Sequence, residues 1–259
     1  MINLSGQVAV VTGVLGRLGT VWAGALLDAG ACVAGLDLRD GPCQVRETPR
    51  FVLIKADITS RAGLRDALAA CQNALGPPSI LVNNAGIDAP PSADGGSWRF
   101  GDIPDEISNG ILEVNAHGTL RACQVFGSEM AKRGYGSIIN IGSLYGVVAP
   151  DPRLYEHLPL DPPFLKPPAY SMSKAGVAAL TRYLAALWGP NGIRVNTLTP
   201  GGVAGGQDPV FTEKFGARVP LRRMACHGDL TGPLLFLASD LSNYVNGVEL
   251  VVDGGYSCW

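Results

Sequence analysis

The sequence predicts an α/β fold in which a doubly wound, seven-stranded parallel sheet lies between two layers of helices. Apolar, β-branched runs recur along the 259 residues, with helix-like segments between them. The runs are continuous rather than alternating, which is typical of strands buried on both faces of a parallel sheet. Strand–helix alternation implies right-handed crossovers. Ligands bind such sheets beyond the carboxyl ends of the strands.

Seven strands and five helices account for this pattern. Strands are expected at 7–12, 31–37, 51–57, 79–86, 137–143, 193–200 and 248–255, and helices at about 17–29, 61–75, 106–133, 169–188 and 229–239. No repeat or low-complexity tail divides the chain, so residues 1–259 are expected to form a single domain. Residues 149–169 carry seven prolines, which exclude helix and central strand. Apolar and aromatic residues there predict an ordered loop or a lid over the site.

Composition excludes several classes of function. A net charge of −2 offers no basic surface for nucleic acid or an anionic membrane. No apolar run approaches the roughly 18 residues that a membrane span needs. The start, MINLSGQVAVV, lacks the pattern of a signal peptide, and the six cysteines form no C-x-x-C pair. Three dispersed histidines predict no metal site. A cytoplasmic protein with reduced thiols is expected.

The stretch TGVLGRLG follows the first strand and precedes the first helix. Gly13, Gly16 and Gly19 permit a tight turn and a close approach of the backbone to a ligand. The next helix would direct its free N–H groups at a pyrophosphate. Arg17 and Leu18 belong to the same turn. Alone the pattern is weak evidence, because short glycine motifs recur by chance.

An acidic residue ends the second strand, 18 residues after Gly19. Asp37 can accept hydrogen bonds from both hydroxyls of an adenosine ribose and would repel a 2′-phosphate, which favours NAD over NADP. Arg39 and Arg17 oppose this preference, since a guanidinium can hold a 2′-phosphate. Asp57, after the third strand, could contact the adenine edge or simply cap the next helix.

The segment YSMSK places Tyr170 and Lys174 one helical turn apart, on the same face. A neighbouring ammonium lowers the pKa of a phenol, so Tyr170 could exchange a proton with an alcohol or ketone near neutral pH. An isolated match would indicate only an ordinary helix. Here Ser143 ends the fifth strand, where it could hold the reacting oxygen, and Asn115 lies within the third helix.

These motifs, together with NNAG, VNAHG, IRVNTLTPGG and VDGG in this order, resemble the short-chain dehydrogenase/reductase superfamily over essentially the whole chain. The resemblance implies a three-layer Rossmann fold with Tyr170 as acid/base, Lys174 as its partner and a ribose ligand, Ser143 as the substrate-orienting hydroxyl, and Asn115 as the anchor of a helix distortion and a relay water. It also implies cofactor contacts by Gly13, Gly16, Arg17, Leu18, Gly19, Asp37, Leu38, Asp57, Ile58, Asn84, Ala85, Gly86, Tyr170, Lys174, Pro200, Gly201 and Val203.

The chain departs from the family's single-domain pattern at three places. Arg17 occupies the position of the usual second glycine, and the TG-x-x-G-x-x-G spacing that results is that of the longer, extended branch, which lacks NNAG. Gly205 stands where a threonine is usual, so we expect a contact to the cofactor to be lost. Ser143 and Tyr170 are 27 residues apart, well beyond the usual spacing, because the proline-rich loop intervenes.

The sequence therefore predicts an NAD-dependent dehydrogenase or ketoreductase of a small polar, sugar-like substrate. Charged loop residues suggest an anionic or polyhydroxylated compound, and GSLYGVVAPDPRLYE resembles a subgroup associated with bacterial surface sugars. An NADP-dependent reductase of a non-sugar carbonyl compound and a non-catalytic dinucleotide sensor are the alternatives. The resemblance implies a homotetramer or homodimer.

Overall fold

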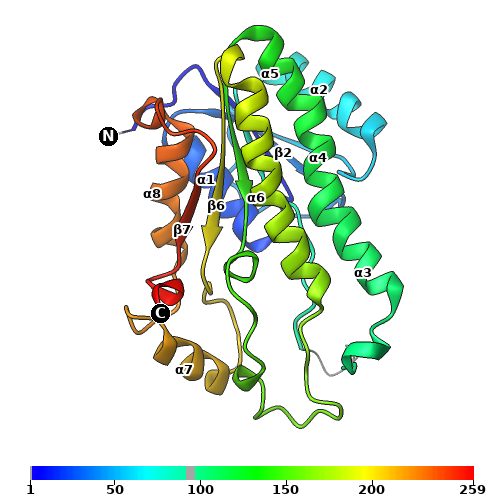
Figure 1. The fold of residues 1–259 in the computed structure, drawn as a ribbon. Coiled ribbons are helices and arrows are strands. Elements are labelled where there is room, and N and C mark those ends of the chain that lie inside the picture. Colours follow the sequence, from blue (N-terminus) through cyan, green and yellow to red (C-terminus); the bar gives the residue numbers. More distant parts are fainter. Residues whose placement is uncertain (1, 92–96) are drawn as a thin grey trace.

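The computed structural model describes residues 2–91 and 97–259. Seven parallel strands form one sheet in the order β3-β2-β1-β4-β5-β6-β7 (Figure 1). The strands are β1 (Val8–Thr12), β2 (Cys32–Asp37), β3 (Phe51–Lys55), β4 (Ile80–Asn83), β5 (Gly136–Ile141), β6 (Ile193–Pro200) and β7 (Glu249–Val252). The strand order reverses between β1 and β4, where ligands bind sheets of this kind.

Burial along the strands follows their place in the sheet. The five inner strands are almost wholly buried, as their continuous apolar runs predict. The edge strands β3 and β7 are only half-buried. Residues of the NNAG motif leave the sheet early, because the backbone N–H of Asn84 donates to Thr12 Oγ1 (3.0 Å) and to the carbonyl oxygen of Val82 in its own strand (3.1 Å) rather than to the backbone of a neighbouring strand. The strand expected at 79–86 therefore ends at Asn83.

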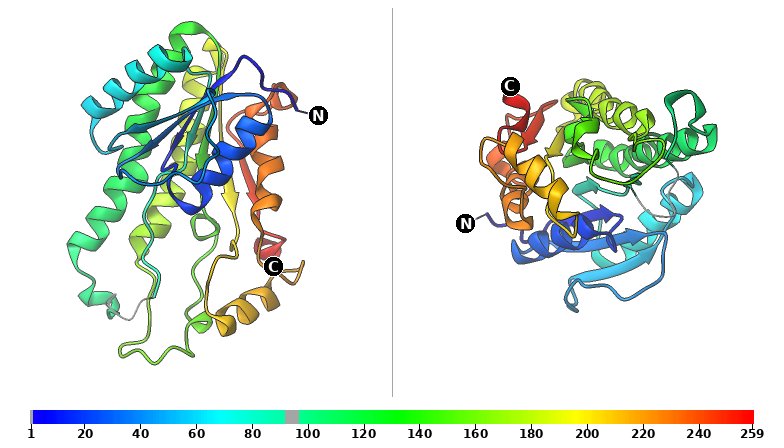
Figure 2. Two further views of the ribbon diagram at one scale, coloured as in Figure 1. Left: turned by 180° about the vertical axis from the view of Figure 1, so that it is seen from behind. Right: turned by 90° about the horizontal axis from the view of Figure 1, so that it is seen from below.

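Helices cover both faces of the sheet (Figure 2). They are α1 (Arg17–Asp28), α2 (Arg61–Leu75), α3 (Asp105–Leu112), α4 (Thr119–Ala122), α5 (Ser128–Arg133), α6 (Pro168–Trp188), α7 (Pro209–Arg218) and α8 (His227–Ala238). Helices α1 and α8 pack on one face around Trp22 and Leu234. Helices α2, α4, α5 and α6 pack on the other, around Phe126 and Leu184. Within the described ranges, no helix has the length and apolar character needed to span a bilayer.

The helix expected at 106–133 is continuous but not uniform. Two π-helical segments, Glu113–Gly118 and Cys123–Gly127, separate α3, α4 and α5. Asn115 lies in the first, and its backbone carbonyl accepts a hydrogen bond from Thr119 Oγ1 (2.8 Å). Wider turns of this kind often occur at functional sites.

A third apolar cluster lies beyond the carboxyl ends of the strands, where α7 and the proline-rich loop project (Figure 1). Leu154 is fully buried there, and Tyr155 contacts both Phe164 and Phe211, with ring centroids 4.7 and 5.2 Å apart. The loop is thus anchored by its own aromatic residues against α7.

Two further details differ from the sequence prediction. Helix α7 was missed, although Asp208 caps it by accepting hydrogen bonds from the N–H groups of Val210 and Phe211, and Pro209 begins it. The loop expected through residue 169 ends at Pro167, because Pro168 occupies the first turn of α6, where its fixed φ is compatible with a helix.

Candidate active site

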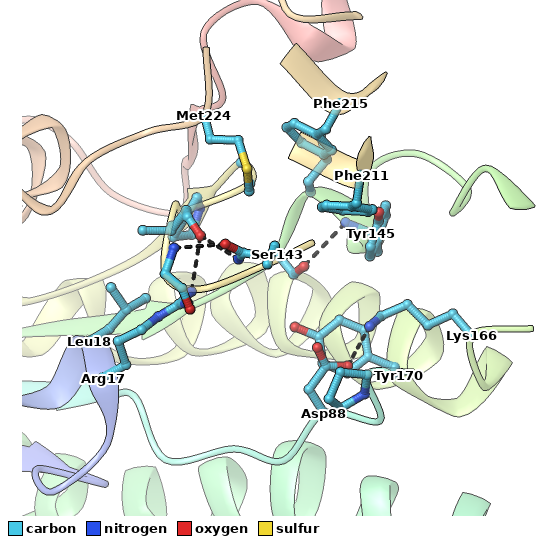
Figure 3. Close-up of a pocket in the computed structure, with 18 of the residues that line it drawn as sticks. Arg17, Leu18, Asp88, Ser143, Tyr145, Lys166, Tyr170, Phe211, Phe215 and Met224 are labelled. Atoms are coloured by element: carbon cyan, nitrogen blue, oxygen red, sulfur yellow. Dashed lines mark hydrogen bonds and ion pairs between the residues drawn. The ribbon is translucent and has the colours of Figure 1, made fainter. Parts of the chain in front are cut away.

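Part of the predicted site lines a cavity of about 680 Å³ at the carboxyl ends of the strands, namely Arg17, Leu18, Asn84, Gly86, Ser143, Tyr170, Lys174, Pro200, Gly201 and Val203. The other predicted residues do not line this cavity, and they are Gly13, Gly16, Gly19, Asp37, Leu38, Asp57, Ile58, Ala85 and Asn115. Arg17 and Leu18 lie on one side of it, and Tyr170, Asp88 and Lys166 on another (Figure 3). Ser143 lies between them. The lining also draws on the segments after β4, β5 and β6, on the proline-rich loop and on α7.

The glycine-rich turn after β1 leaves no space for side chains at two of its glycines. Gly13 has a φ of +65°, and a Cβ there would lie 2.8 Å from the Ala85 Cα. A Cβ at Gly19 would lie 2.1 Å from the Gly13 carbonyl oxygen. Gly16 caps α1, whose N-terminal N–H groups begin at the turn. This close backbone and the positive end of a 12-residue helix fit a pyrophosphate.

Asn84 braces this turn from the neighbouring strand. Its Nδ2 donates to the carbonyl oxygens of Thr12 (3.0 Å) and Gly13 (3.1 Å), and its Oδ1 accepts a hydrogen bond from Trp22 Nε1 (2.8 Å). The side chain predicted to line the cofactor site therefore also fixes the shape of the turn. Trp22, fully buried in α1, was not recognised from the sequence.

Asp37 ends β2 beside the turn. Its Oδ2 accepts a hydrogen bond from the Leu15 N–H (2.9 Å), and its Oδ1 accepts from Arg39 N and Nε, both at 3.1 Å. Burial opposes ionisation, but the hydrogen bonds from Arg39 and Leu15 outweigh it and hold the pKa of Asp37 below its ordinary value. A charged, fixed acceptor fits the two hydroxyls of a ribose.

The remaining predicted contacts near the adenosine side have local roles in this structure. Asp57 Oδ1 accepts hydrogen bonds from Thr59 N and Oγ1, both at 2.8 Å, so it stabilises the turn before α2. Ile58 packs against Gly118, and Leu38 is exposed.

Pro200 ends β6, Gly201 and Val203 follow it, and all three line the pocket. A Cβ at Gly201 would lie 2.7 Å from the Asp253 Cα. The backbone of the VDGG segment, residues 252–255, therefore leaves room only for glycine at residue 201.

Arg17 joins the glycine-rich turn to the segment after β6. Its Nη2 donates to the Val203 carbonyl oxygen (3.2 Å) and its Nη1 to that of Gly205 (3.3 Å). A Cβ at residue 205 would lie 2.0 Å from Arg17 Nη1. The chain departs from the family pattern at both positions, with Arg17 for glycine and Gly205 for threonine. The two residues are in contact, and the absence of a side chain at residue 205 leaves room for the Arg17 guanidinium.

Asn115 holds the segment that follows NNAG. Its Oδ1 accepts a hydrogen bond from Ile87 N (2.8 Å), and its Nδ2 donates to Ile87 O (3.0 Å) and to Ser173 Oγ (3.2 Å). Ser173 Oγ in turn donates to the Tyr170 carbonyl oxygen (2.7 Å). Asn115 thus links the π-helical segment both to Ile87, in the segment after β4, and to α6. The role of Ser173 was not predicted.

Ser143, Tyr170 and Lys174 line one wall of the pocket. Lys174 is buried, and its Nζ donates to the Ile141 carbonyl oxygen (2.9 Å) while lying 6.0 Å from the Tyr170 ring centroid. Burial lowers the pKa of Lys174 to about 8, against the negative charge of Asp88, which raises it.

The pKa of Tyr170 moves in the direction opposite to that expected from the Tyr–Lys spacing. The pKa is raised to about 12, because burial and then the charge of Asp88 raise it by more than a hydrogen bond with Ser143 lowers it. The expected lowering is absent because burial and the charge of Asp88 outweigh the hydrogen bond with Ser143.

A second lysine contacts this tyrosine. The Nζ of Lys166, from the proline-rich loop, lies 2.5 Å from Asp88 Oδ1 and 4.7 Å from the Tyr170 ring centroid (Figure 3). The sequence pointed to Lys166 only as one of several loop charges and did not single out Asp88. Their positions, four residues before Tyr170 and two after NNAG, were the available signals.

Comparison with known proteins identifies the family of the chain. Residues 7–155 match the family model described as short chain dehydrogenase, and residues 163–257 match one described as enoyl-(acyl carrier protein) reductase. The chain belongs to the short-chain dehydrogenase/reductase superfamily. It is an oxidoreductase that interconverts a secondary alcohol and a ketone with a nicotinamide dinucleotide.

Its curated relatives include two polyol dehydrogenases. Galactitol 2-dehydrogenase (L-tagatose-forming) of Cereibacter sphaeroides is 32% identical, over 100% of this chain and 98% of the relative. D-threitol dehydrogenase of Mycolicibacterium smegmatis is also 32% identical, over 98% and 94%. A short chain dehydrogenase from Leptospira borgpetersenii, solved with bound NAD+, is 34% identical with a TM-score of 0.87, over 98% of this chain and 94% of that one.

Proposed function

We propose that this short-chain dehydrogenase uses NAD+ to oxidise a secondary alcohol of a small polyhydroxylated compound to the ketone, with Tyr170 as the acid/base. The observation that carries the proposal is the convergence of Ser143, Tyr170 and Lys174 on one pocket that the glycine-rich turn also lines. The polyol dehydrogenases among the relatives support the substrate class.

In this proposal each residue has a distinct task. Ser143 donates a hydrogen bond to the reacting oxygen, and Tyr170 accepts the hydroxyl proton as the carbonyl forms. Lys174, fixed by the Ile141 carbonyl, contributes a positive charge beside the phenol and holds the ribose. Bound dinucleotide supplies the acceptor for the hydride that leaves the carbinol carbon. In the reductive direction Tyr170 returns the proton.

Asn115 acts as a positioning residue in the same scheme. Both atoms of its amide contact Ile87, the residue before Asp88, and its Nδ2 also reaches Ser173 on α6. It therefore fixes the position of Ile87 and Asp88, which line the pocket, relative to Tyr170. The relay water predicted from the family would lie beside this amide.

Asp37 favours NAD+ as the coenzyme. Its carboxylate is buried, charged and fixed by the Leu15 N–H, so a 2′-phosphate at the adenosine ribose would meet a negative charge. Arg39 is the residue that could reverse the preference, because its guanidinium already lies against Asp37. Direct titration with NADH and NADPH tests this preference. Asp37→Ala is expected to reduce the ratio of NADH affinity to NADPH affinity by about tenfold or more.

We also propose a cytoplasmic homotetramer or homodimer. Apolar side chains remain exposed on α6, including Met172, Tyr183 and Leu187, and near the C-terminal strand, including Tyr244 and Trp259. Exposed apolar groups on two separate faces are typical of subunit contacts. All six cysteines are free, which fits a reducing compartment. Sedimentation analysis of the purified protein measures the assembly.

The reaction is tested by following nicotinamide absorbance with NAD+ or NADP+ and a panel of polyols, sugars, sugar acids and cyclic alcohols. Turnover of a polyhydroxylated compound with NAD+, and a ketone identified by NMR in the product, is expected. Turnover with NADP+ alone would overturn the coenzyme assignment. NADH binding without oxidation of any alcohol would favour the sensor alternative.

A further inference from the structure

Asp88, Tyr145, Lys166 and Tyr170 line one part of the pocket, which we call the substrate side. It contains an ion pair that the proposed chemistry does not use. Lys166 Nζ lies 2.5 Å from Asp88 Oδ1, although the residues are 78 positions apart. The same ammonium lies 4.7 Å from the ring centroid of Tyr170 and 5.5 Å from that of Tyr145. Two aromatic faces and a carboxylate therefore enclose this cation beside the predicted acid/base.

The two members of the pair differ in their access to the pocket. The side chain of Lys166 is 5% exposed, whereas that of Asp88 is 46% exposed. The ammonium is thus sealed beneath the loop, and the group offered to an incoming molecule is the carboxylate. Asn115 fixes Ile87, the residue before Asp88, through both atoms of its amide, so the carboxylate is also held in place.

The other charged side chains that line the pocket also indicate that carboxylates, rather than ammonium groups, are offered to an incoming molecule. Lys174 is engaged by the Ile141 carbonyl, and His157 lies 2.8 Å from Asp208, the second half-exposed carboxylate of the pocket. Arg17, the exposed cation, lies at the glycine-rich turn and donates to Val203 and Gly205. The substrate side therefore presents negative oxygen acceptors, which bind hydroxyl groups and repel carboxylates and phosphates.

We propose that Asp88, held by Lys166, binds the non-reacting hydroxyls of the substrate and selects neutral polyols over sugar acids and sugar phosphates. This inference rests on the proposed function and narrows the substrate class of the same site. It favours the polyhydroxylated substrate over the anionic one, because Lys166, the loop cation beside Tyr170, is buried and paired with Asp88.

The inference is tested by comparing kcat/KM for neutral polyols such as galactitol and threitol with that for sugar acids such as gluconate. Asp88→Asn keeps the shape of the side chain and removes its charge. It is expected to lower kcat/KM for polyols by about 10- to 100-fold, mainly through KM, and to reduce the polyol preference, with NADH affinity unchanged. Asp66→Asn, exposed on α2, is the matched control and should have no effect.

Because Asp88→Asn leaves the Lys166 ammonium buried without its partner, a second variant guards against misfolding. Asp88→Asn with Lys166→Met removes both charges and should retain the folded state and NADH binding while losing the polyol preference. Unchanged polyol preference in both variants, or a wild-type preference for sugar acids, would overturn the inference and leave the oxidoreductase assignment intact. Failure of the wild type to oxidise any secondary alcohol would overturn the inference together with the proposed function.

Discussion

Tyr170 lies in an environment that keeps its phenol protonated. Burial and the nearby Asp88 carboxylate together raise its pKa to about 12. Lys174, whose pKa burial lowers to about 8, is directed at a backbone carbonyl. In the cofactor-free protein, the side chains alone therefore favour the proton-donating form, which serves ketone reduction. Alcohol oxidation needs the phenolate and so gains from rising pH.

This environment predicts the titration of Tyr170 in the cofactor-free protein. A raised pKa means that the neutral phenol persists as pH rises through the ordinary tyrosine value of about 10. The near-ultraviolet difference spectrum between wild type and Tyr170→Phe should therefore show no phenolate below about pH 9. A phenolate step near neutral pH would contradict the assignment.

The site residues could be predicted from the sequence only where a local pattern marks them. Tyr170 and Lys174 are one helical turn apart, Asp37 ends β2, and Ser143 follows the apolar run of β5 by two residues. Asp88 and Lys166 carry no such mark, because their contact joins the segment after β4 to a loop 78 residues away. The direction of the Tyr170 pKa shift was predicted wrongly because spacing shows a neighbouring charge but not desolvation.

At the scale of elements, Arg17 acts as a bridge between α1 and the segment after β6. It begins the helix at the glycine-rich turn and donates to the carbonyls of Val203 and Gly205. Only glycine at 205 leaves room for the guanidinium. The bridge therefore couples the predicted phosphate-binding turn to the segment predicted to contact the nicotinamide.

A substitution at Gly205 tests this coupling. Gly205→Ala would displace the Arg17 guanidinium, which can move because it ends a flexible side chain. We expect unfolding free energy to change by less than about 1 kcal/mol and NADH affinity to fall by about tenfold, measured by fluorescence titration. Arg17→Met should cause a similar loss, and the double variant should be no worse than Arg17→Met.

Gly24→Ala is the control for this cycle, because a Cβ at Gly24 in α1 meets nothing within 4 Å. Additive losses in the double variant would show that Arg17 and Gly205 act independently. That result would contradict the coupling.

Most strands, and the helices between them, could be predicted because strands buried in a parallel sheet appear in the sequence as continuous apolar runs. Helix α7 was missed because it is short and lies in a segment that the strand–helix alternation does not require, although the Asp208–Pro209 pair marks its start. The helix distortion at Asn115 was expected from the family resemblance, and the structure places a π-helical segment there. The second π-helical segment, Cys123–Gly127, had no signal in the sequence.

At the scale of the whole molecule, the proline-rich loop is part of the fold rather than a free cover. Its aromatic residues join a cluster with α7 and the C-terminal turn, in which Phe215 and Tyr256 stack with centroids 4.9 Å apart. Asp151 pairs with Arg153 and Arg218, and these arginines hold the pKa of Asp151 well below its ordinary value. The loop thereby brings Lys166 to the active site.

Truncation of the central loop residue should loosen this cluster. Leu154 is fully buried, and Leu154→Ala is expected to cost about 2–5 kcal/mol of local stability. We expect faster hydrogen exchange in the loop and α7, a higher KM for substrate and unchanged NADH affinity. Leu241→Ala, at an exposed position, is the control. Loss of NADH binding, or faster hydrogen exchange throughout the sheet, would contradict the claim that this cluster is stabilised separately from the sheet.

The central claim is that Tyr170 transfers the proton in alcohol oxidation, and a single-turnover rate in the Tyr170→Phe variant tests it most directly. The variant keeps the ring and removes the hydroxyl, while Tyr183→Phe, exposed on the same helix, is the matched control. We expect the rate to fall by about 10²- to 10⁴-fold in Tyr170→Phe with NADH affinity intact, and the control to match wild type. A rate within about tenfold of wild type would contradict the role of Tyr170.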